Sequence, residues 1–518
     1  MKNKIFLAAL AILFIVTNGC TDLDSESYSE LTEQNAYTNE TTLLNGLSGV
    51  YGTLGFYTDA YFKMVIPATD EGICPTRGAD WNSSDLRNLH SHLWTPENGE
   101  INGAYNSISG AISKCNAFID AVENGGFSSE AVDVMIGETR FLRAFYYYLL
   151  CDNFGIAPII TTQLKEAPMQ STRKQLFDFI LSELNEIETI LPEINEYGRV
   201  DRNAIWFLKA KLFLNAEVYV DSEMLGEALV ECNKIIASNT YHLYNEGNSD
   251  SSREFLDIFA NDNDQADKRV ENIFTIRFNS QTDDWGKAFF LQQNTLHYNL
   301  QEKYGLAESP WNGFATIRDA VERYDAVEGN NNIWTSEDQR FKCILTGQQY
   351  DNAGVALTER DESIPLNFTI DFRSLENATE SNGARVLKWV PGGVLISHFI
   401  NNDFTIFRFA DVILMKAEIL ARQNGGTITS EALELINVIR RRSNATELTS
   451  ATMDDLLDER GREFLWEFWR RNDLIRFNKF TTVAWDLKTN IGETYRNLYS
   501  IPTSQISNNP NLKQNSGY

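Results

Sequence analysis

The sequence contains none of the short motifs that identify common catalytic sites. It has no H-E-x-x-H zinc motif, no G-x-S-x-G nucleophile elbow and no glycine-rich phosphate loop. Its five histidines form no metal-ligand spacing beyond the weak pair His90 and His92. Carboxylates are abundant, so a glycoside hydrolase that uses two of them stays open as an alternative, although no pair stands out. These absences leave the chain without a candidate catalytic residue.

Long apolar runs, cysteines and basic residues are also scarce. No segment reaches the roughly 20 apolar residues that a membrane-spanning helix needs. The cysteines beyond residue 20 are widely spaced and form no C-x-x-C, so we expect buried small hydrophobes and neither a zinc site nor a redox motif; they are Cys74, Cys115, Cys151, Cys232 and Cys343. Acidic residues number 72 against 45 basic ones, and the formal net charge is −27. Such a chain repels phosphate backbones, so we expect no nucleic-acid partner.

The first 40 residues are typical of an export signal followed by a tether. Lys2 and Lys4 precede an uncharged apolar run, Ile5 to Val16, and Gly19 stands before Cys20. Residues 17–20 are similar to a bacterial lipoprotein box, apart from a threonine where an aliphatic residue is commoner. An ordinary signal peptide with an incidental cysteine is the alternative. We predict a signal peptide over residues 1–19, lipidation at Cys20, and an anchor and tether over residues 20–40.

Apolar residues recur at helical spacing in segments that come in pairs. The clearest pair is 409–426 with 431–443, which Gly425-Gly426 separates and Thr429 or Ser430 can cap. Further helices are indicated at 105–122, 140–155, 174–190, 205–220 and 226–238. Helix pairs of this size favour tetratricopeptide-like units, although no repeat carries that full signature. The pattern predicts a mainly α fold built as an array of helix pairs.

The composition changes between Tyr241 and Asp403, where Asn, Asp, Gly and Ser clusters separate short apolar pieces. Residues 67–103 form a second loop-rich stretch. Loops on a rigid scaffold often carry recognition residues. Beyond the signal and tether we predict three parts: a tetratricopeptide-like helical part with an N-terminal ligand loop (41–240), a loop-rich inserted ligand-binding region (241–404), and a C-terminal helical part that completes the array (405–518).

Three tryptophans stand in polar, turn-like surroundings: Trp81 in GADWNSSD, Trp285 in TDDWGK and Trp311 in ESPWNG. The apolar face of a sugar ring stacks on a flat aromatic ring, and side-chain amides bind its hydroxyls. We therefore predict ligand contacts from Trp81, Asn82, Trp285 and Trp311; packing on a satellite core is the alternative for Trp81. Aromatic residues within helical patterns are expected in the core, namely Trp206, Trp466, Trp469, Tyr146, Tyr147 and Tyr148.

Two charged segments could be mistaken for binding sites. Residues 261–267 (NDNDQAD) could hold a structural calcium ion, but they lack the glycine and closing glutamate of an EF-hand loop. We therefore expect no cofactor, and leave calcium open as an alternative. The arginines near the C-terminus are expected to pair with the many carboxylates and serve structure; they are Arg460, Arg462, Arg470, Arg471 and Arg476.

Six blocks that occur in a fixed order beyond residue 19 match a known pattern. They are residues 20–24 (CTDLD), 138–159 (ETRFLRAFYYYLLCDNFGIAPI), 198–219 (GRVDRNAIWFLKAKLFLNAEVY), 407–426 (FRFADVILMKAEILARQNGG), 460–477 (RGREFLWEFWRRNDLIRF) and 499–518 (YSIPTSQISNNPNLKQNSGY). Together they resemble the SusD/RagB family of outer-membrane nutrient-binding lipoproteins from Bacteroidetes, and are most similar to its starch-binding members.

The resemblance implies a fold, a role and a partner. The implied fold is a set of tetratricopeptide-like helix pairs packed against a loop-rich half that carries the ligand face. The implied role is non-enzymatic capture of glycan by a lipid-anchored protein on the cell surface, at the outer membrane, for a SusC-like TonB-dependent transporter. The alternative outside this class is a helical-repeat scaffold that binds a protein or peptide.

The resemblance also bears on the ligand. Trp81, Trp285 and Trp311 fall where starch-binding members place an aromatic arc, with Trp285 in place of a tyrosine. A curved arc favours a starch-like α-glucan. The chain departs from the family at Ala79 and Ser84, where those members have an aromatic residue and an asparagine, and no arginine corresponds to the one that hydrogen-bonds glucose.

Overall fold

The structure is a computed structural model that describes residues 37, 39–162, 167–245, 254–283, 289–393, 395 and 399–518. The predicted signal peptide and the predicted lipidation of Cys20 lie outside these residues, and so does Trp285. Within them, no helix is long and apolar enough to cross a membrane.

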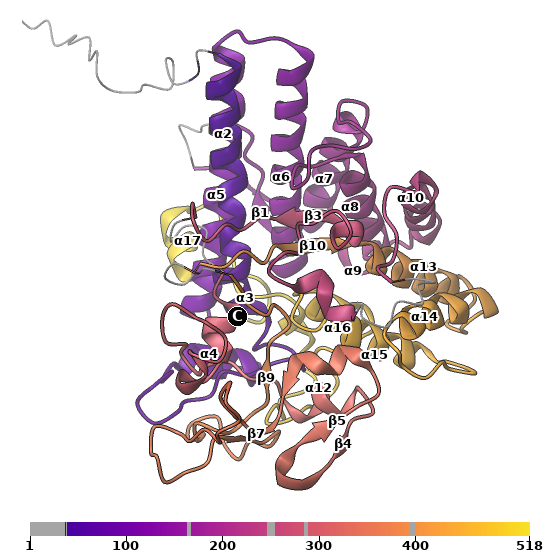
Figure 1. Cartoon of the computed structure of the whole chain (residues 1–518). Helices are drawn as coiled ribbons and strands as arrows, with labels where there is room; N and C mark the ends of the chain where they lie inside the picture. Colours follow the sequence, from indigo (N-terminus) through magenta and orange to yellow (C-terminus); the bar gives the residue numbers. More distant parts are fainter. Residues whose placement is uncertain are drawn as a thin grey trace, which may run out of the picture.

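The fold is mainly α-helical, as the sequence predicts, and the helices pack in an array (Figure 1). Neighbouring pairs are α5 with α6, α6 with α7, α8 with α10, and α13 with α14, while α10 also packs on α13. The array consists of α2 (Glu40–Gly52), α5 (Gly99–Asn124), α6 (Glu130–Asn153), α7 (Arg173–Ile187), α8 (Arg202–Leu214), α9 (Ala216–Val220), α10 (Leu225–Ser238), α13 (Phe409–Gln423), α14 (Ser430–Arg442), α15 (Met453–Glu463) and α16 (Arg470–Arg476).

The α13–α14 pair forms where the apolar pattern predicts it. Gly425 and Gly426, with φ of 65° and 83°, end the first helix in backbone conformations that favour glycine. Thr429 begins the second, because its hydroxyl accepts a hydrogen bond from the amide of Ala432 at 3.1 Å. The inner stripes of both helices are buried, so packing of these faces stabilises the pair.

The predicted helix over 205–220 is interrupted, which corrects that prediction. The chain leaves the helix at Asn215, where φ is −97° and ψ is 7°, and resumes as α9. The Asn215 amide donates to the carbonyl of Lys211 at 2.8 Å. Such local side-chain bonds compete with helix continuation, and the apolar spacing carries no sign of them.

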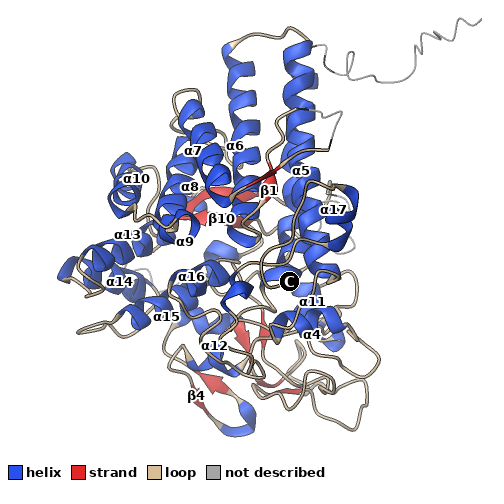
Figure 2. Cartoon of the chain, turned by 180° about the vertical axis from the view of Figure 1, so that it is seen from behind, coloured by secondary structure: helices blue, strands red, loops and turns tan. Residues whose placement is uncertain are grey.

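The loop-rich half contains only short elements; most of them lie low in Figure 1, whereas its longest strand pair lies among the helices of the array. Its strands pair two by two and antiparallel: β3 (Asn272–Ile276) with β10 (Phe404–Arg408), β4 (Val327–Glu328) with β5 (Trp334–Thr335), β6 (Ile344–Leu345) with β9 (Arg385–Val386), and β7 (Gly347–Gln348) with β8 (Asn367–Phe368). The short helices α11 (Leu291–Thr295) and α12 (Arg318–Glu322) belong to the same half. Figure 2 shows the strands as short pieces among long loops.

Further elements lie outside these two sets. Residues 67–103, predicted as loop-rich, include the helix α4 (Ser84–His90) and the start of α5. Other elements include the 3₁₀ helix η1 (Thr53–Thr58), α3 (Ala60–Val65), the pair β1 (Ala157–Pro158) and β2 (Gln170–Ser171), and α17 (Thr503–Asn508). One hydrophobic cluster runs through both halves, so the boundaries of the predicted parts stay a prediction.

The core confirms several predictions about single residues. The five cysteines beyond residue 20 are free and buried. Trp466, Trp469 and Tyr146 to Tyr148 are buried. Trp206 is only half-buried, because its indole N–H reaches out to Glu188 at 2.8 Å.

The C-terminal arginines are structural, as predicted. Arg460 binds Asp411 and Asp473, each at 2.8 Å, and Arg470 binds Asp70 at 2.6 Å; all of these side chains are largely buried. Ion pairs also hold Arg462, Arg471 and Arg476. Because Asp70 comes from the loop after α3, these pairs tie the C-terminal helices to the N-terminal part of the chain.

Candidate functional site

The structure brings together two of the three predicted tryptophans. The indole N–H of Trp81 donates to the backbone carbonyl of Trp311 at 2.8 Å, although 230 positions separate them. Both side chains are half-buried. Trp81 also packs edge-to-face on Phe314, with ring centroids 5.5 Å apart. Trp81 is therefore partly exposed to solvent and also packs on the core. The sequence leaves two interpretations open for it, ligand contact and core packing, and this position is compatible with both.

A tight turn positions Trp81. The amide of Arg77 donates to the carbonyl of Asp80 at 2.9 Å, and the amide of Asp80 donates back to Arg77 at 3.0 Å. Trp81 follows with φ of 55°, in the left-handed region that non-glycine residues rarely adopt. A Cβ atom on Gly313 would lie 2.3 Å from the indole. Only glycine at position 313 therefore lets the Trp81 ring lie against the Trp311 loop.

Backbone hydrogen bonds to α11 hold the Trp311 loop. The amide of Trp311 donates to the carbonyl of Gln293 at 2.7 Å, and the amide of Gly313 donates to Asn294 at 2.8 Å. The Trp311 ring lies against Phe290, with centroids 5.4 Å apart and planes tilted by 33°. Both tryptophans therefore belong to loops with a defined conformation, which lowers the entropy cost of ligand binding.

The other predicted contact residues have different outcomes. Asn82 is exposed next to Trp81, and its side-chain oxygen Oδ1 accepts a hydrogen bond from Arg87 at 3.3 Å. Trp285 lies outside the described residues; Asp283 and Phe289 flank its segment. The ligand role of Trp81, Asn82, Trp285 and Trp311 stays a prediction.

A polar rim beside Trp81 was missed by the sequence analysis. Arg360 donates to Asp80 and to Glu380, each at 2.6 Å, and its guanidinium lies 4.3 Å from the Tyr298 ring centroid. The Arg360 side chain is 52% exposed. An arginine thus stands beside the tryptophans, although it comes from a distant hairpin. Nothing in the local sequence marks it, because residues 350–365 show neither apolar periodicity nor a motif.

The rim has a defined protonation state at neutral pH. The hydroxyl of Tyr298 donates to Asp80 at 2.8 Å, and this bond lowers the pKa of Asp80, with a further contribution from Arg360. Burial lowers the pKa of His297 to about 4, and its ring nitrogen lies 2.9 Å from Glu380. The carboxylates of Asp80 and Glu380 therefore stay ionised and bound to Arg360, which suits hydrogen bonding to a ligand better than proton transfer.

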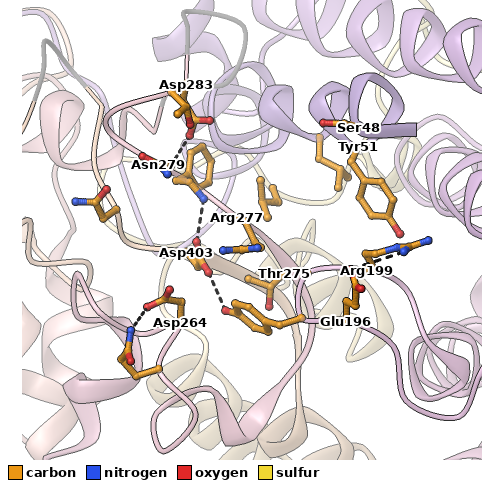
Figure 3. A pocket seen from close by; sticks show the side chains of 18 of the residues that line it. Ser48, Tyr51, Glu196, Arg199, Asp264, Thr275, Arg277, Asn279, Asp283 and Asp403 are labelled. Atoms are coloured by element: carbon orange, nitrogen blue, oxygen red, sulfur yellow. Dashed lines mark hydrogen bonds and ion pairs between the residues drawn. The ribbon is translucent and has the colours of Figure 1, made fainter. Parts of the chain in front are cut away.

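One cavity adjoins the Trp311 loop, and a larger one lies on other elements of the fold. A cavity of about 370 Å³ between η1 and α5 is lined on one side by Phe290, the ring that contacts Trp311. A larger one, of about 660 Å³, lies between α2, residues 196–199, residues 261–265 and the end of β3 (Figure 3). Neither Trp81 nor Trp311 lines the larger cavity.

The segment with the calcium alternative borders the larger cavity. Asp262 binds Lys268 at 2.5 Å, and the Asn263 amide donates to the carbonyls of Ile258 and Asp403. Among the residues that the structure describes, no three His, Cys, Asp or Glu side chains are placed to share a metal ion. Calcium binding at 261–267 is only an alternative that the sequence leaves open, and no ligand cluster among the described residues supports it.

Comparisons with known proteins agree in both halves of the chain. A model of the SusD family matches residues 270–518, and a model described as starch-binding, associating with outer membrane, matches residues 23–214. The starch-binding protein SusD of Bacteroides thetaiotaomicron is 29% identical to this chain, over 90% of this chain and 86% of its own length. A SusD-like protein of Bacteroides ovatus is 22% identical, over 93% of this chain and 83% of its own.

Solved structures share the fold. A SusD homolog from Bacteroides thetaiotaomicron superposes with a TM-score of 0.74 at 18% identity, covering 95% of this chain and 100% of its own. The surface glycan-binding protein A of the same species, solved in complex with laminarihexaose, superposes with a TM-score of 0.69 at 19% identity, covering 92% and 100%. The arrangement of helix pairs and loop-rich half is therefore common to these proteins.

Proposed function

This chain belongs to the SusD family, and we propose that it is a cell-surface lipoprotein that captures glycan and delivers it to a SusC-like TonB-dependent transporter of the outer membrane. One observation carries the proposal: Trp81 and Trp311, distant in sequence, meet at one hydrogen-bonded loop junction. Rings held in this way offer flat apolar surface at little cost in conformational entropy.

The surroundings of the two rings suit a sugar ligand. A pyranose presents an apolar C–H face to the ring of Trp311 and hydroxyls at its edge. The carboxylates of Asp80 and Glu380 accept hydrogen bonds, and the exposed guanidinium of Arg360 donates them. Charge-assisted hydrogen bonds of this kind are stronger than neutral ones and orient the ligand.

The favoured ligand is a starch-like α-glucan. Its support is the 29% identical relative, which is named a starch-binding protein, together with the arc that the resemblance predicts for Trp81, Trp285 and Trp311. Because one structural relative was solved in complex with laminarihexaose, binding to a β-glucan has to be measured beside binding to an α-glucan.

Location and partner form a second part of the proposal. Lipidation at Cys20 would hold the protein on the membrane surface, in keeping with the outer-membrane association named for the family model over residues 23–214. The helical array would contribute a docking surface for the transporter. Co-purification of a transporter-sized partner after mild detergent extraction tests this part, and a monomer under those conditions contradicts it.

Affinity electrophoresis of the mature soluble chain tests the ligand. The chain should be retarded in gels that contain amylopectin and migrate freely in gels that contain laminarin or cellulose derivatives. Retardation by β-glucan alone would contradict the α-glucan proposal but keep the glycan-binding function. If no glycan retards the chain, the helical-repeat scaffold that binds a protein or peptide becomes the better account.

A further inference from the structure

The larger cavity is a pocket of its own, on a different set of elements from the tryptophan pair. Its walls come from α2, residues 196–199, residues 261–265 and the end of β3, and it measures about 660 Å³ (Figure 3). This volume lies within the range of roughly 300–1,000 Å³ that is typical of small-ligand sites. Of the described residues to which we assign the glycan face, Trp81, Asn82 and Trp311 do not line it.

Arg277 is the distinctive residue of this cavity. Its side chain is exposed and makes no hydrogen bond or ion pair with any residue that the structure describes, and its guanidinium lies 5.5 Å from the centroid of the Tyr197 ring. By contrast, Arg199, across the same cavity, is bound to Glu138 at 2.5 Å. Arg277 therefore keeps its hydrogen-bonding capacity for a ligand.

The neighbouring residues hold Arg277 in position. Gly198 has φ of 84°, and a Cβ there would lie 2.4 Å from the Cδ atom of Arg277, so the arginine stem occupies the space above this glycine. The hydroxyl of Tyr197 donates to Asp403 at 2.8 Å, and the amide of Phe278 donates to the other oxygen of Asp403 at 2.8 Å. Asp403 is only 2% exposed. The ring beneath the guanidinium is thus fixed by a buried carboxylate.

The carboxylates around the cavity already have partners. Asp262 is bound to Lys268, Asp264 accepts from the amide of Gln265 at 2.9 Å, and Asp283 accepts from the backbone amide of Asn279 at 2.6 Å. Glu196 lies 3.7 Å from Arg199. These carboxylates create a negative electrostatic potential around the cavity, which disfavours a polyanionic ligand.

Further unpaired groups in the cavity wall can donate hydrogen bonds. Besides Arg277 they are the hydroxyls of Ser48 and Thr282 and the side-chain amide of Asn261, none of which bonds to a residue in the described part of the chain. Leu44 and Leu47 on α2 contribute apolar surface to the wall. The matching ligand carries many acceptor oxygens, no more than a small negative charge, and an apolar face.

We infer that this cavity is a second saccharide site, which binds a neutral oligosaccharide through Arg277 independently of the tryptophan pair. The choice of a saccharide as the ligand rests on the proposed function. The inference adds a second binding site to that function. Such a site would let one chain hold glycan at two points, which raises the apparent affinity for long chains without a change in either contact.

Calorimetric titration of the mature chain with short saccharides tests the inference. Maltotriose, laminaritriose and digalacturonate are the probes, since trisaccharides can fill the two places separately. We expect the native chain to show two separable binding events with a neutral trisaccharide. Arg277→Ala should weaken one of them by about tenfold or more, because hydrogen bonds to a charged group are lost, and Trp311→Ala should remove the other.

Two further variants make the result specific. Ser48→Leu, on the exposed face of α2, should fill the cavity and weaken the same event as Arg277→Ala. Arg373→Ala removes another exposed arginine that makes no hydrogen bond within the described residues and lies outside the cavity, and it should change neither event. The thermal unfolding midpoint of Arg277→Ala should match that of the native chain.

The possible failures can be told apart. If the native chain binds a neutral trisaccharide and neither Arg277→Ala nor Ser48→Leu changes the titration, the second site is wrong and the tryptophan site stands. If only digalacturonate binding depends on Arg277, the neutral ligand class is wrong. If the native chain binds no saccharide, the proposed function and the second site fall together.

Discussion

The indole N–H of Trp81 and the backbone carbonyl of Trp311 form a hydrogen bond of 2.8 Å. This bond uses the single polar atom of the Trp81 side chain, so Trp81 can offer a ligand only its ring. It also ties the turn at residues 77–81 to the loop that carries Trp311. Trp81 thus both presents a surface and holds its neighbour in place.

Trp81→Phe separates these two roles. The phenyl ring keeps part of the packing on Phe314 but cannot reach the Trp311 carbonyl, so we expect the free energy of unfolding to fall by about 1 kcal/mol. Glycan binding should weaken as well, because the Trp311 loop loses a restraint. Trp206→Phe is the matched control, since Trp206 is also half-buried and donates to Glu188 at 2.8 Å. Urea denaturation and a glycan titration should show that the control affects stability alone.

Trp311→Ala should nearly abolish binding to maltooligosaccharides. Truncation of an aromatic residue at a recognition site commonly costs about 2 kcal/mol or more, which is roughly thirtyfold in affinity. Trp285→Ala should have the same effect, and both variants should unfold near the native midpoint. Trp334→Ala, on the β4–β5 hairpin, is a control that should bind normally. Binding that survives both changes, or that falls together with thermal stability, would place these residues outside the ligand surface.

The helix pairs could be predicted from the sequence because they are local. Apolar residues at helical spacing and a glycine pair suffice to place α13 and α14, since the same residues that form the pattern make the contact. The break at Asn215 could not be predicted, because it depends on one side chain that bonds to the turn before it. Local pattern therefore predicts element type better than element length.

The candidate site was predictable only in part. Polar surroundings identify Trp81 and Trp311 as unusual, but nothing in either segment says that they touch across 230 positions. Arg360 shows the limit most clearly: it reaches Asp80 from an irregular hairpin whose sequence has no period and no motif. Contacts between loops depend on how the whole core closes, and that information is spread over many residues.

Cys20→Ala tests the anchor. If Cys20 carries the lipid, this change should block lipoprotein processing. The protein should then move from the membrane fraction to the soluble fraction, because only the acyl chains on Cys20 hold it to the membrane leaflet. Fractionation and mass spectrometry of the mature N-terminus measure the result. Membrane attachment that persists without a bound acyl chain would contradict the prediction.

A buried glutamate in the helical array should make the fold sensitive to acid. Burial alone would raise the pKa of Glu418, but Arg476 and Arg422 outweigh this effect and lower the pKa to about 2. The unfolded carboxyl titrates near 4.5, so its contribution to stability is complete above that pH and is lost as the pH falls towards 2. Glu418→Gln leaves Asp473, at 2.7 Å, as the carboxylate partner of Arg476 and should lower the free energy of unfolding by about 1–3 kcal/mol at neutral pH, because hydrogen bonds between charged groups are lost. Denaturant titrations at several pH values measure both effects; equal stability of variant and native chain would contradict the prediction.

A second buried glutamate should act with the opposite sign. Burial raises the pKa of Glu71 to about 8, and among the residues that the structure describes only Trp466 donates to its carboxyl group, through its backbone amide at 3.2 Å. Between the unfolded value of 4.5 and this folded value, the native state holds a proton that the unfolded state has released, so stability falls as the pH rises through the window. The glutamine in Glu71→Gln cannot ionise. The difference between the free energies of unfolding of variant and native chain should therefore shift in favour of the variant by a few kcal/mol between about pH 5 and pH 8. Parallel urea titrations across this range measure the difference, with Glu418→Gln as the control that lacks such a gain. A difference between Glu71→Gln and the native chain that does not change with pH would mean that Glu71 stays ionised in the fold, held by Arg470 and Arg323 in spite of its burial.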